Sequence, residues 1–421
     1  MSDFVFFYAR KLLFSCFSCI FASEKFKTTD NMKIKLFVMS LATAELLTAC
    51  NMGKGTDGTA STEDSTAVNE MVSDIEDDGY DLEALAKVTE SAKTVFGFSE
   101  GRASVINKDD KLGVIDKKGN VIIPFEYDYS VYHYTDGVMC CHKNAEDMRY
   151  YFDHDGKLLF TTKDGGNDQF HDGFACKYCS DDGKYYFIDK NGEPAFGGKK
   201  WEWAEPFSDG MALVAEGALW GFINTKGELV VPCKYESRAE ENPEGFSDGL
   251  ARVVVDPATE RLGFIDKTGK RAFAKEFMTA FSFNEGMAGA YDNDQDCWGY
   301  IDKTGKMVIT LDQGVSGRNF SEGLALVHHW GTPIGYIDKT GKMVFQFEGE
   351  PYKDAQPFHD GMARVWDGSH DGFIDTTGKL VIPCEYSCGE GFSEGLAPVM
   401  KGGKAGFIAK DGKSTFDYYK N

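Results

Sequence analysis

One short phrase, an aromatic residue followed by any residue, an acid and glycine, occurs nine times at intervals of 34 to 39 residues. The copies begin at Phe98, Tyr134, Phe170, Phe207, Phe246, Phe283, Phe320, Phe358 and Phe392. A second phrase, Asp-x-x-Gly, follows each copy, with Asn224 and Ala409 replacing its Asp in two places. Such a period predicts an array of small stacked units, because a single unit cannot bury its own apolar face.

Both phrases predict tight turns. An acid that opens a four-residue turn can accept a hydrogen bond from the backbone two residues on, and glycine at the fourth position tolerates a positive φ. The runs between the turns, such as 250–255 and 298–301, are short and rich in Val, Ile, Phe and Tyr, which is typical of strands. We therefore expect three strands and two hairpin turns in each unit, with the glycine forming a bulge.

The positions around the turns predict a repeated core. Two residues after the glycine of the first phrase stands alanine in eight copies, and Met139 in the other. We expect the aromatic residue of the phrase to be buried, contributing about 1.5–3 kcal/mol when fully removed from water. Turn chemistry alone accounts for the acids at both positions, so we assign them no metal-binding role. No residue stands out as catalytic, and we expect no cofactor.

The repeated pattern Phe-Ser-[Glu/Asp]-Gly-Leu-Ala-x-Val, followed by Trp-Gly-Phe-Ile-Asp-x-x-Gly-Lys-x-Val-Ile-Pro, resembles the bacterial WG repeat, also called the KWG repeat. The naming dipeptide is kept at Trp220-Gly221 and Trp298-Gly299, and its glycine is replaced by Tyr150 and Tyr186 in the second and third copies. The resemblance covers residues 95–421. It implies a non-enzymatic array, often found in exported proteins, whose ligands are mostly unassigned.

The all-β array can be open or closed. A propeller blade usually has four strands and about 40 or more residues, and the spacing here suits three strands better. Closed rings often split one repeat between the two termini, whereas this chain begins and ends in nearly the same phase. We therefore favour an open, curved or superhelical stack of nine hairpin or meander repeats, with a closed propeller-like ring as the alternative.

Residues 1–49 predict a signal region. Basic residues at 33–35 precede an apolar stretch at 36–49, and Leu47-Thr-Ala-Cys50 resembles the bacterial lipobox. The resemblance implies cleavage before Cys50 and lipid attachment to its sulfur. We expect translation to begin at Met32. A longer signal or an uncleaved anchor is the alternative, because residues 12–21 form a second apolar stretch.

The next segment predicts a tether. Residues 51–66 are polar and poor in hydrophobic side chains, so they cannot form a core. We therefore assign residues 50–94 to a lipidated cysteine followed by a flexible linker, and residues 95–421 to the repeat array. Residues 81–93 can form a short amphipathic helix that caps the first repeat.

The charge of the chain excludes one class of partner. Its 67 acidic and 45 basic side chains give a net charge of −22, which disfavours binding to nucleic acid.

Several cysteines lie in the second and third repeats. Cys140 and Cys176 occupy equivalent positions in adjacent copies, and with Cys141, His142 and Cys179 they supply donors for zinc. A Cys140–Cys176 disulfide and a zinc site are alternatives to ordinary buried thiols, which we favour.

The leading functional hypothesis is a membrane-anchored, extracytoplasmic scaffold that binds a protein, peptide or glycan without catalysis. Tyr127, Tyr235 and Tyr386 could stack on sugars, although we expect them to serve packing. The insertion at 236–243 is a candidate loop for partner contact. The alternatives are an enzyme or accessory protein acting on cell-wall polysaccharide, which needs two positioned carboxylates, and a passive structural spacer.

Overall fold

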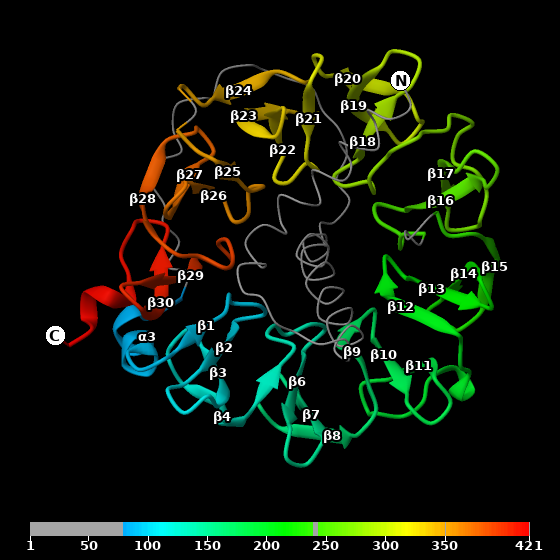
Figure 1. Cartoon of the computed structure of the whole chain (residues 1–421). Coiled ribbons are helices and arrows are strands. Elements are labelled where there is room, and N and C mark those ends of the chain that lie inside the picture. Colours follow the sequence, from blue (N-terminus) through cyan, green and yellow to red (C-terminus); the bar gives the residue numbers. More distant parts are fainter. Residues whose placement is uncertain (1–78, 239–242, 350, 421) are drawn as a thin grey trace, which may run out of the picture. The chain divides into compact units, whose positions relative to one another are not determined.

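The repeats form nine small antiparallel sheets that follow one another around a closed ring (Figure 1). The computed structural model describes residues 79–238, 243–349 and 351–420, which all belong to one compact unit. Neighbours within each sheet are consecutive in sequence, so every sheet is a meander. The all-β prediction is confirmed.

We number the sheets in chain order. Sheets 1 to 4 contain β1 (Thr94–Val95), β2 (Arg102–Ile106), β3 (Leu112–Asp116) and β4 (Val121–Tyr127); β5 (Tyr129–Ser130), β6 (Val138–Lys143), β7 (Met148–Asp153) and β8 (Leu158–Thr162); β9 (Gly165–His171), β10 (Phe174–Cys179) and β11 (Lys184–Ile188); and β12 (Trp203–Ser208), β13 (Met211–Glu216), β14 (Leu219–Asn224) and β15 (Leu229–Tyr235).

Sheets 5 to 9 contain β16 (Leu250–Asp256) and β17 (Arg261–Asp266); β18 (Met287–Asp292), β19 (Cys297–Asp302) and β20 (Met307–Thr310); β21 (Val315–Gly317), β22 (Leu324–His329), β23 (Thr332–Asp338) and β24 (Met343–Gln346); β25 (Asp354–Ala355), β26 (Met362–Trp366), β27 (Asp371–Asp375) and β28 (Leu380–Tyr386); and β29 (Leu396–Lys401) and β30 (Lys404–Ala409). Two 3₁₀ turns, η1 (Phe196–Gly198) and η2 (Thr415–Tyr418), and one α-helix, α3 (Leu82–Thr89), complete the described elements.

The first phrase forms a two-residue hairpin loop. In repeat 1, Ser99 and Arg102 exchange both backbone hydrogen bonds, at 2.8 and 3.1 Å, around Glu100 and Gly101. Both central residues have positive φ, 52° for Glu100 and 72° for Gly101. This is the geometry of a type I′ turn, whose twist matches that of the flanking strands. The predicted hairpin is confirmed, but the acid occupies the first central position instead of opening a four-residue turn.

The second phrase forms the turn that the sequence predicts. In repeat 1, Oδ1 of Asp116 accepts hydrogen bonds from the backbone N–H groups of Lys118 and Asn120, both at 2.9 Å. The N–H of Gly119 donates to the carbonyl of Asp116 at 3.0 Å, and Gly119 has a φ of 75°. The aspartate therefore holds the turn, and the glycine takes the left-handed conformation that the bulge requires.

The predicted core columns are buried between the sheets. All nine aromatic residues of the first phrase are at most 2% exposed, and the alanine or methionine two residues after the glycine is 0% exposed in every copy. These side chains belong to nine hydrophobic clusters, one at each junction between consecutive sheets, including the junction of sheet 9 with sheet 1. Each sheet is thus stabilised by both neighbours.

The favoured open stack is not confirmed, because the last repeat packs on the first. Phe98, Val105 and Ile115 of sheet 1 share a cluster with Leu396 and Phe407 of sheet 9. The hydroxyl of Ser393 donates to the carbonyl of Phe98 at 2.7 Å. The closed ring, which was the alternative, is the arrangement observed.

The short repeat is compatible with a closed ring because the innermost strands are very short. Five of the nine sheets have four strands, and in sheets 1, 2 and 8 the innermost strand has only two residues. So short a strand has no apolar run by which to recognise it. Closure also needs no split repeat. The side chains of Ser393 and Glu394 bond to the backbone of repeat 1, and the hydrophobic cluster between sheets 9 and 1 joins the two ends.

Helix α3 covers the junction where the ring closes. Asp81 caps its N-terminus by accepting the N–H of Ala84 at 2.9 Å, and Leu82 and Leu85 pack into the cluster shared by sheets 9 and 1. The hydroxyls of Thr89 and Tyr419 lie 2.8 Å apart. The predicted capping helix is confirmed, and it contacts both ends of the array. Within residues 79–420 as described, no helix is long and apolar enough to span a membrane.

Candidate functional site

The acids of the first phrase form a continuous ring of hydrogen bonds, which we call the carboxylate belt. Each carboxylate accepts the backbone N–H of the turn glycine in the next repeat, at 2.5 to 3.0 Å. Glu394 closes the belt by binding Gly101 of the first repeat. The belt consists of Glu100, Asp136, Asp172, Asp209, Asp248, Glu285, Glu322, Asp360 and Glu394.

Lysines and serines reinforce the belt from neighbouring repeats. Lys267 contacts Asp209 at 2.8 Å and Lys339 contacts Glu285 at 3.1 Å, each lysine coming from the second phrase of the following repeat. Ser208 donates to the carbonyl of Phe246 at 2.7 Å in the same direction around the ring. The acids of the first phrase therefore join neighbouring repeats. From the sequence, we had explained them by local turn formation alone.

Breaking the belt at its closure should destabilise the ring measurably. In Glu394→Ala the N–H of Gly101 loses its acceptor and Lys117 loses the carboxylate 3.3 Å from its ammonium. We expect the free energy of unfolding to fall by about 1–3 kcal/mol, measured by urea titration. Glu193→Ala, at an exposed acid outside the belt, is the control. Equal effects of the two substitutions would show that the belt does not stabilise closure.

The cysteines of repeats 2 and 3 do not meet. Cys140 packs in the cluster between sheets 2 and 3, whereas Cys176 packs in the cluster between sheets 3 and 4. Equivalent residues of consecutive repeats each face the following sheet, so one sheet lies between them. All eight described cysteines are free thiols, and the described residues contain no group of three ligands that could hold a metal. Burial raises the pKa of Cys140 and Cys141.

Sheets 2 and 3 instead enclose a charged cluster that the sequence analysis missed. The ammonium of Lys177, whose side chain is fully buried, contacts the carboxylate of Asp168 and lies 2.7 Å from the hydroxyl of Tyr151. Arg149 binds the other oxygen of Asp168 at 2.9 Å. The sequence could have indicated this cluster, because Lys177 occupies the position of Val214 in repeat 4 and Val253 in repeat 5.

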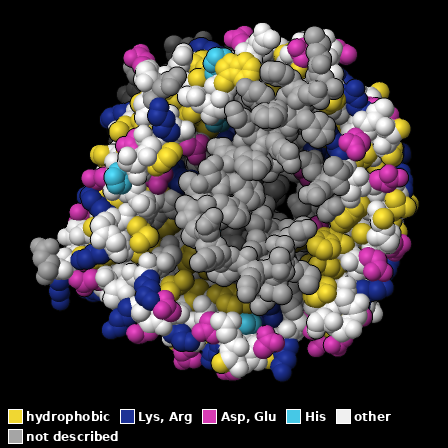
Figure 2. Space-filling model, in the orientation of Figure 1, with side chains coloured by type: hydrophobic (Ala, Val, Ile, Leu, Met, Phe, Trp, Pro, Cys, Tyr) yellow, Lys and Arg dark blue, Asp and Glu magenta, His cyan; other side chains and the backbone are white. Residues whose placement is uncertain are grey.

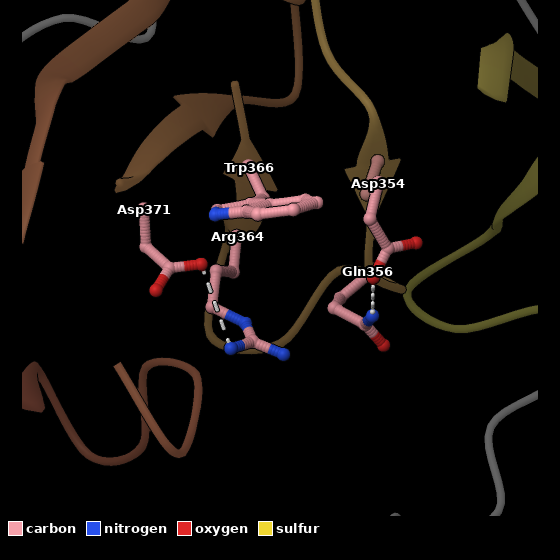
Figure 3. Close-up of a pocket in the computed structure, with 6 residues that line it drawn as sticks. Asp354, Gln356, Arg364, Trp366 and Asp371 are labelled. Atoms are coloured by element: carbon pink, nitrogen blue, oxygen red, sulfur yellow. Dashed lines mark hydrogen bonds and ion pairs between the residues drawn. The ribbon is translucent and has the colours of Figure 1, made fainter. Parts of the chain in front are cut away.

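A hollow of about 260 Å³ lies at sheet 8, where the repeat pattern is again broken. It is lined by Asp354, Ala355, Gln356, Arg364, Trp366 and Asp371. Figure 3 shows the guanidinium of Arg364 between the Asp371 carboxylate and the Gln356 amide, with the Trp366 indole above it in this view. We call this the sheet 8 hollow.

Strand register places these side chains together. Trp366 on β26 pairs with Asp354 on β25 and with Asp371 on β27, so the three residues form one row across the sheet. Arg364 lies two residues from Trp366 and therefore on the same face, because successive side chains of a strand alternate. That face is turned toward sheet 9, as Met362 and Phe373 pack there against Phe392.

The row of side chains across sheet 8 differs in size from that of sheet 4: Trp366 stands where sheet 4 has Ala215, and aspartates stand where it has Trp203 and Trp220. Asp371 immediately precedes Gly372 and so occupies the position of Trp220 in repeat 4. Trp220 is 6% exposed and fills its site, where its indole N–H donates to Ser237 at 2.9 Å. Aspartate is much smaller than tryptophan, and its place in repeat 8 is left open. The sequence contained this signal, because Asp371 differs from the tryptophan found at the same position in repeats 4 and 6.

Internal bonds hold the polar groups of the hollow. Asp371 accepts the N–H of Cys388 at 2.9 Å, and the Arg364 guanidinium donates to the Cys388 carbonyl at 2.6 Å and lies 3.6 Å from Asp371. Gln356 donates through its amide nitrogen to Asp354 at 2.8 Å. Burial raises the pKa of Asp371, and the Cys388 N–H and the Arg364 charge oppose the rise.

Other polar groups of the hollow have hydrogen-bond donors or acceptors that no described residue uses. Among the described residues, none bonds to the Trp366 indole N–H, to Oε1 of Gln356 or to Nη2 of Arg364. Trp366 is 40% exposed although it is a large aromatic residue. The hollow therefore presents donors, an acceptor and an aromatic surface to an incoming molecule.

The other residues singled out in the sequence are either packed in the core or lie outside the described residues. Tyr127 and Tyr386 are 6% and 5% exposed, so they serve packing, and Tyr235 packs against the cluster between sheets 4 and 5. Cys50, the signal region and residues 51–78 of the tether lie outside the described residues, as does the middle of the 236–243 insertion. Residues 79–94, which we also assigned to the tether, are described and include α3, whose Leu82 and Leu85 pack in the ring. Figure 2 shows acidic and basic side chains interspersed over the visible face of the ring.

Fold and site together define a closed-ring β-repeat protein with a polar hollow at sheet 8. The model of the WG containing repeat matches residues 113–140, 187–219, 220–256, 263–294, 298–327, 334–365 and 372–404, more than half of the chain. The chain belongs to the WG-repeat family. No curated protein is significantly similar to it.

Solved structures resemble the chain only remotely. BamB from Moraxella catarrhalis is 11% identical with a TM-score of 0.30, over 64% of this chain and 80% of that one. Sqt1 from Saccharomyces cerevisiae is 9% identical with a TM-score of 0.33, over 78% of this chain and 95% of that one. Likeness at this level carries no argument about function.

Proposed function

We propose that this protein is a non-catalytic binding scaffold, held outside the cytoplasm by a lipid on Cys50, which binds a protein, peptide or glycan partner. The observation that carries the proposal is the sheet 8 hollow. There a half-exposed Trp366 lies beside polar groups whose bonding capacity is incompletely used. Nine otherwise similar repeats supply the rigid frame that holds these side chains in place.

The carboxylate belt supports the non-catalytic part of the proposal. Hydrolysis by paired acids requires two carboxylates about 5–10 Å apart with distinct environments and access to the substrate. The nine belt acids share one environment, and each accepts a hydrogen bond from the next repeat. Asp168 and Asp371, two acids outside the belt, are each held by an arginine.

Anchoring and partner binding can be tested together in cells. We expect the wild-type chain to fractionate with membranes and Cys50→Ala to appear in the soluble extracytoplasmic fraction. Surface crosslinking should capture a partner with the wild type and with Tyr178→Ala, but not with Trp366→Ala. Tyr178 is the matched control, because it has the same place in repeat 3 and is 38% exposed. Unchanged membrane association of Cys50→Ala would refute the anchor, and turnover of wall polysaccharide by the purified protein would refute the scaffold.

A further inference from the structure

We propose that the sheet 8 hollow binds a neutral saccharide unit, with Trp366 as the stacking surface and Gln356 and Arg364 as the hydroxyl-binding groups. This inference rests on the proposed binding function and names the chemistry of its ligand. A sugar ring has apolar C–H faces and hydroxyl groups around its edge. It therefore needs an aromatic face and in-plane donors and acceptors in one place, and the hollow combines them.

The size and walls of the hollow favour one sugar-sized group. Its volume of about 260 Å³ is just below the roughly 300–1,000 Å³ usual for small-molecule sites. Trp366 and Ala355 are the apolar members of the lining, and the other four members are polar. An apolar peptide side chain would leave these polar groups without partners, which is costly, whereas hydroxyls can satisfy them.

The charges around the hollow favour a neutral ligand. Arg364 and Asp371 form one ion pair, and Arg318 lies 4.0 Å from Asp354 in a second. Burial and the nearby Arg318 lower the pKa of His328 to about 4, so this neighbour is uncharged at pH 7. Balanced local charge, in a chain of net charge −22, gives an anionic polymer no electrostatic advantage.

The geometry also assigns roles to individual side chains. Asp371 and the carbonyl of Cys388 hold the Arg364 guanidinium in place, leaving Nη2 available. Asp354 orients the Gln356 amide by accepting its N–H group, so that Oε1 remains to accept from a hydroxyl. Groups held by their own bonds lose little freedom when a ligand arrives.

The test is calorimetric titration of the full chain, purified in detergent, with three neutral trisaccharides: maltotriose, cellotriose and chitotriose. We expect at least one to bind weakly, with a Kd on the order of 0.1–1 mM. Trp366→Ala should weaken that binding at least about tenfold, and Gln356→Leu should weaken it while leaving the fold intact. Tyr178→Ala, the matched aromatic position of repeat 3, should bind as the wild type does.

Filling the hollow gives an independent arm. Asp371→Trp restores the residue found in repeats 4 and 6, and it should abolish saccharide binding. Absence of binding by all three sugars, or equal binding by Trp366→Ala and the wild type, would overturn the inference. So would binding of an uncharged alanine tripeptide that Trp366→Ala abolishes, in the absence of sugar binding. Those outcomes leave the scaffold proposal intact, whereas hydrolysis of a bound trisaccharide would refute the scaffold alone.

Discussion

Ending the chain after Gly391 should expose sheet 1, at the opposite end of the sequence. The truncation removes sheet 9 and η2, so Phe98, Val105 and Ile115 lose the partners in their shared cluster. Three buried side chains at about 1.5–3 kcal/mol each suggest that the free energy of opening of sheet 1 falls by roughly 5 kcal/mol. Amide exchange in β2 should then accelerate by nearly four orders of magnitude, since each 1.36 kcal/mol is about a factor of ten.

Hydrogen exchange monitored by mass spectrometry measures this effect. Strand β13, which lies in sheet 4, serves as the internal reference, because its own interfaces are not removed. In a linear stack each repeat contacts only its neighbours, so loss of the last repeat would leave the first unaffected. Unchanged exchange in β2 would therefore restore the open stack and contradict the closed ring.

Neutralising Asp168 should have the largest effect of any single substitution considered. In Asp168→Asn the fully buried Lys177 loses the carboxylate that compensates its charge. Removing one partner of a buried ion pair typically costs about 3–5 kcal/mol, because the other charge remains in an apolar surrounding. The midpoint of urea unfolding should fall accordingly, with little change in its slope.

A double-mutant cycle separates the interaction energy of Asp168 with Lys177 from the effect of each substitution alone. Lys177→Val, which introduces the residue of repeats 4 and 5, should cost less, because Asp168 keeps Arg149 at 2.9 Å. Combining Lys177→Val with Asp168→Asn should recover much of the loss, since no lysine charge remains buried. Strictly additive losses would show that Asp168 and Lys177 do not compensate each other.

The same pair predicts how stability depends on pH. Burial tends to raise the pKa of Asp168, but the charges of Lys177 and Arg149 outweigh it and hold the pKa below its usual range. The stabilisation is therefore complete above the unfolded-state pKa of about 3.9 and is lost as the pH falls through the folded-state value. Asp168→Asn should lack this component of acid destabilisation.

Much of the fold was predictable because its rules are local. The first phrase positions the hairpin before the second strand of a sheet and the second phrase the hairpin after the third, since positive φ and side-chain capping act within a few residues. The middle hairpin, such as β2–β3 at residues 107–111, lies in neither phrase. Burial of Phe98 and Ala103, and of their equivalents, follows from the alternation of side chains along a strand. Helix α3 was predictable from its cap and its apolar spacing. The type I′ geometry was not, because an acid before glycine is compatible with several turns.

Much less of the candidate site was predictable. Asp371 and Lys177 differ from their repeat columns, and that difference is visible in the sequence. Its consequence is not, because whether a missing tryptophan leaves a hollow depends on what the next sheet supplies. Gly406 of repeat 9 follows Ala405, yet there Phe416 and Tyr419 occupy the nearby space.

The sequence by itself determined the unit: its length, its two turns, its buried columns and its family. Only the tertiary structure decided that nine units close, that Glu394 reaches Gly101 across 293 residues, and that Trp366 lies beside an open space. The physical reason is the distance along the chain over which the interactions act. Turns and strand alternation are governed by neighbours in the chain, whereas closure and the sheet 8 hollow depend on how each sheet packs against the next, and the last against the first.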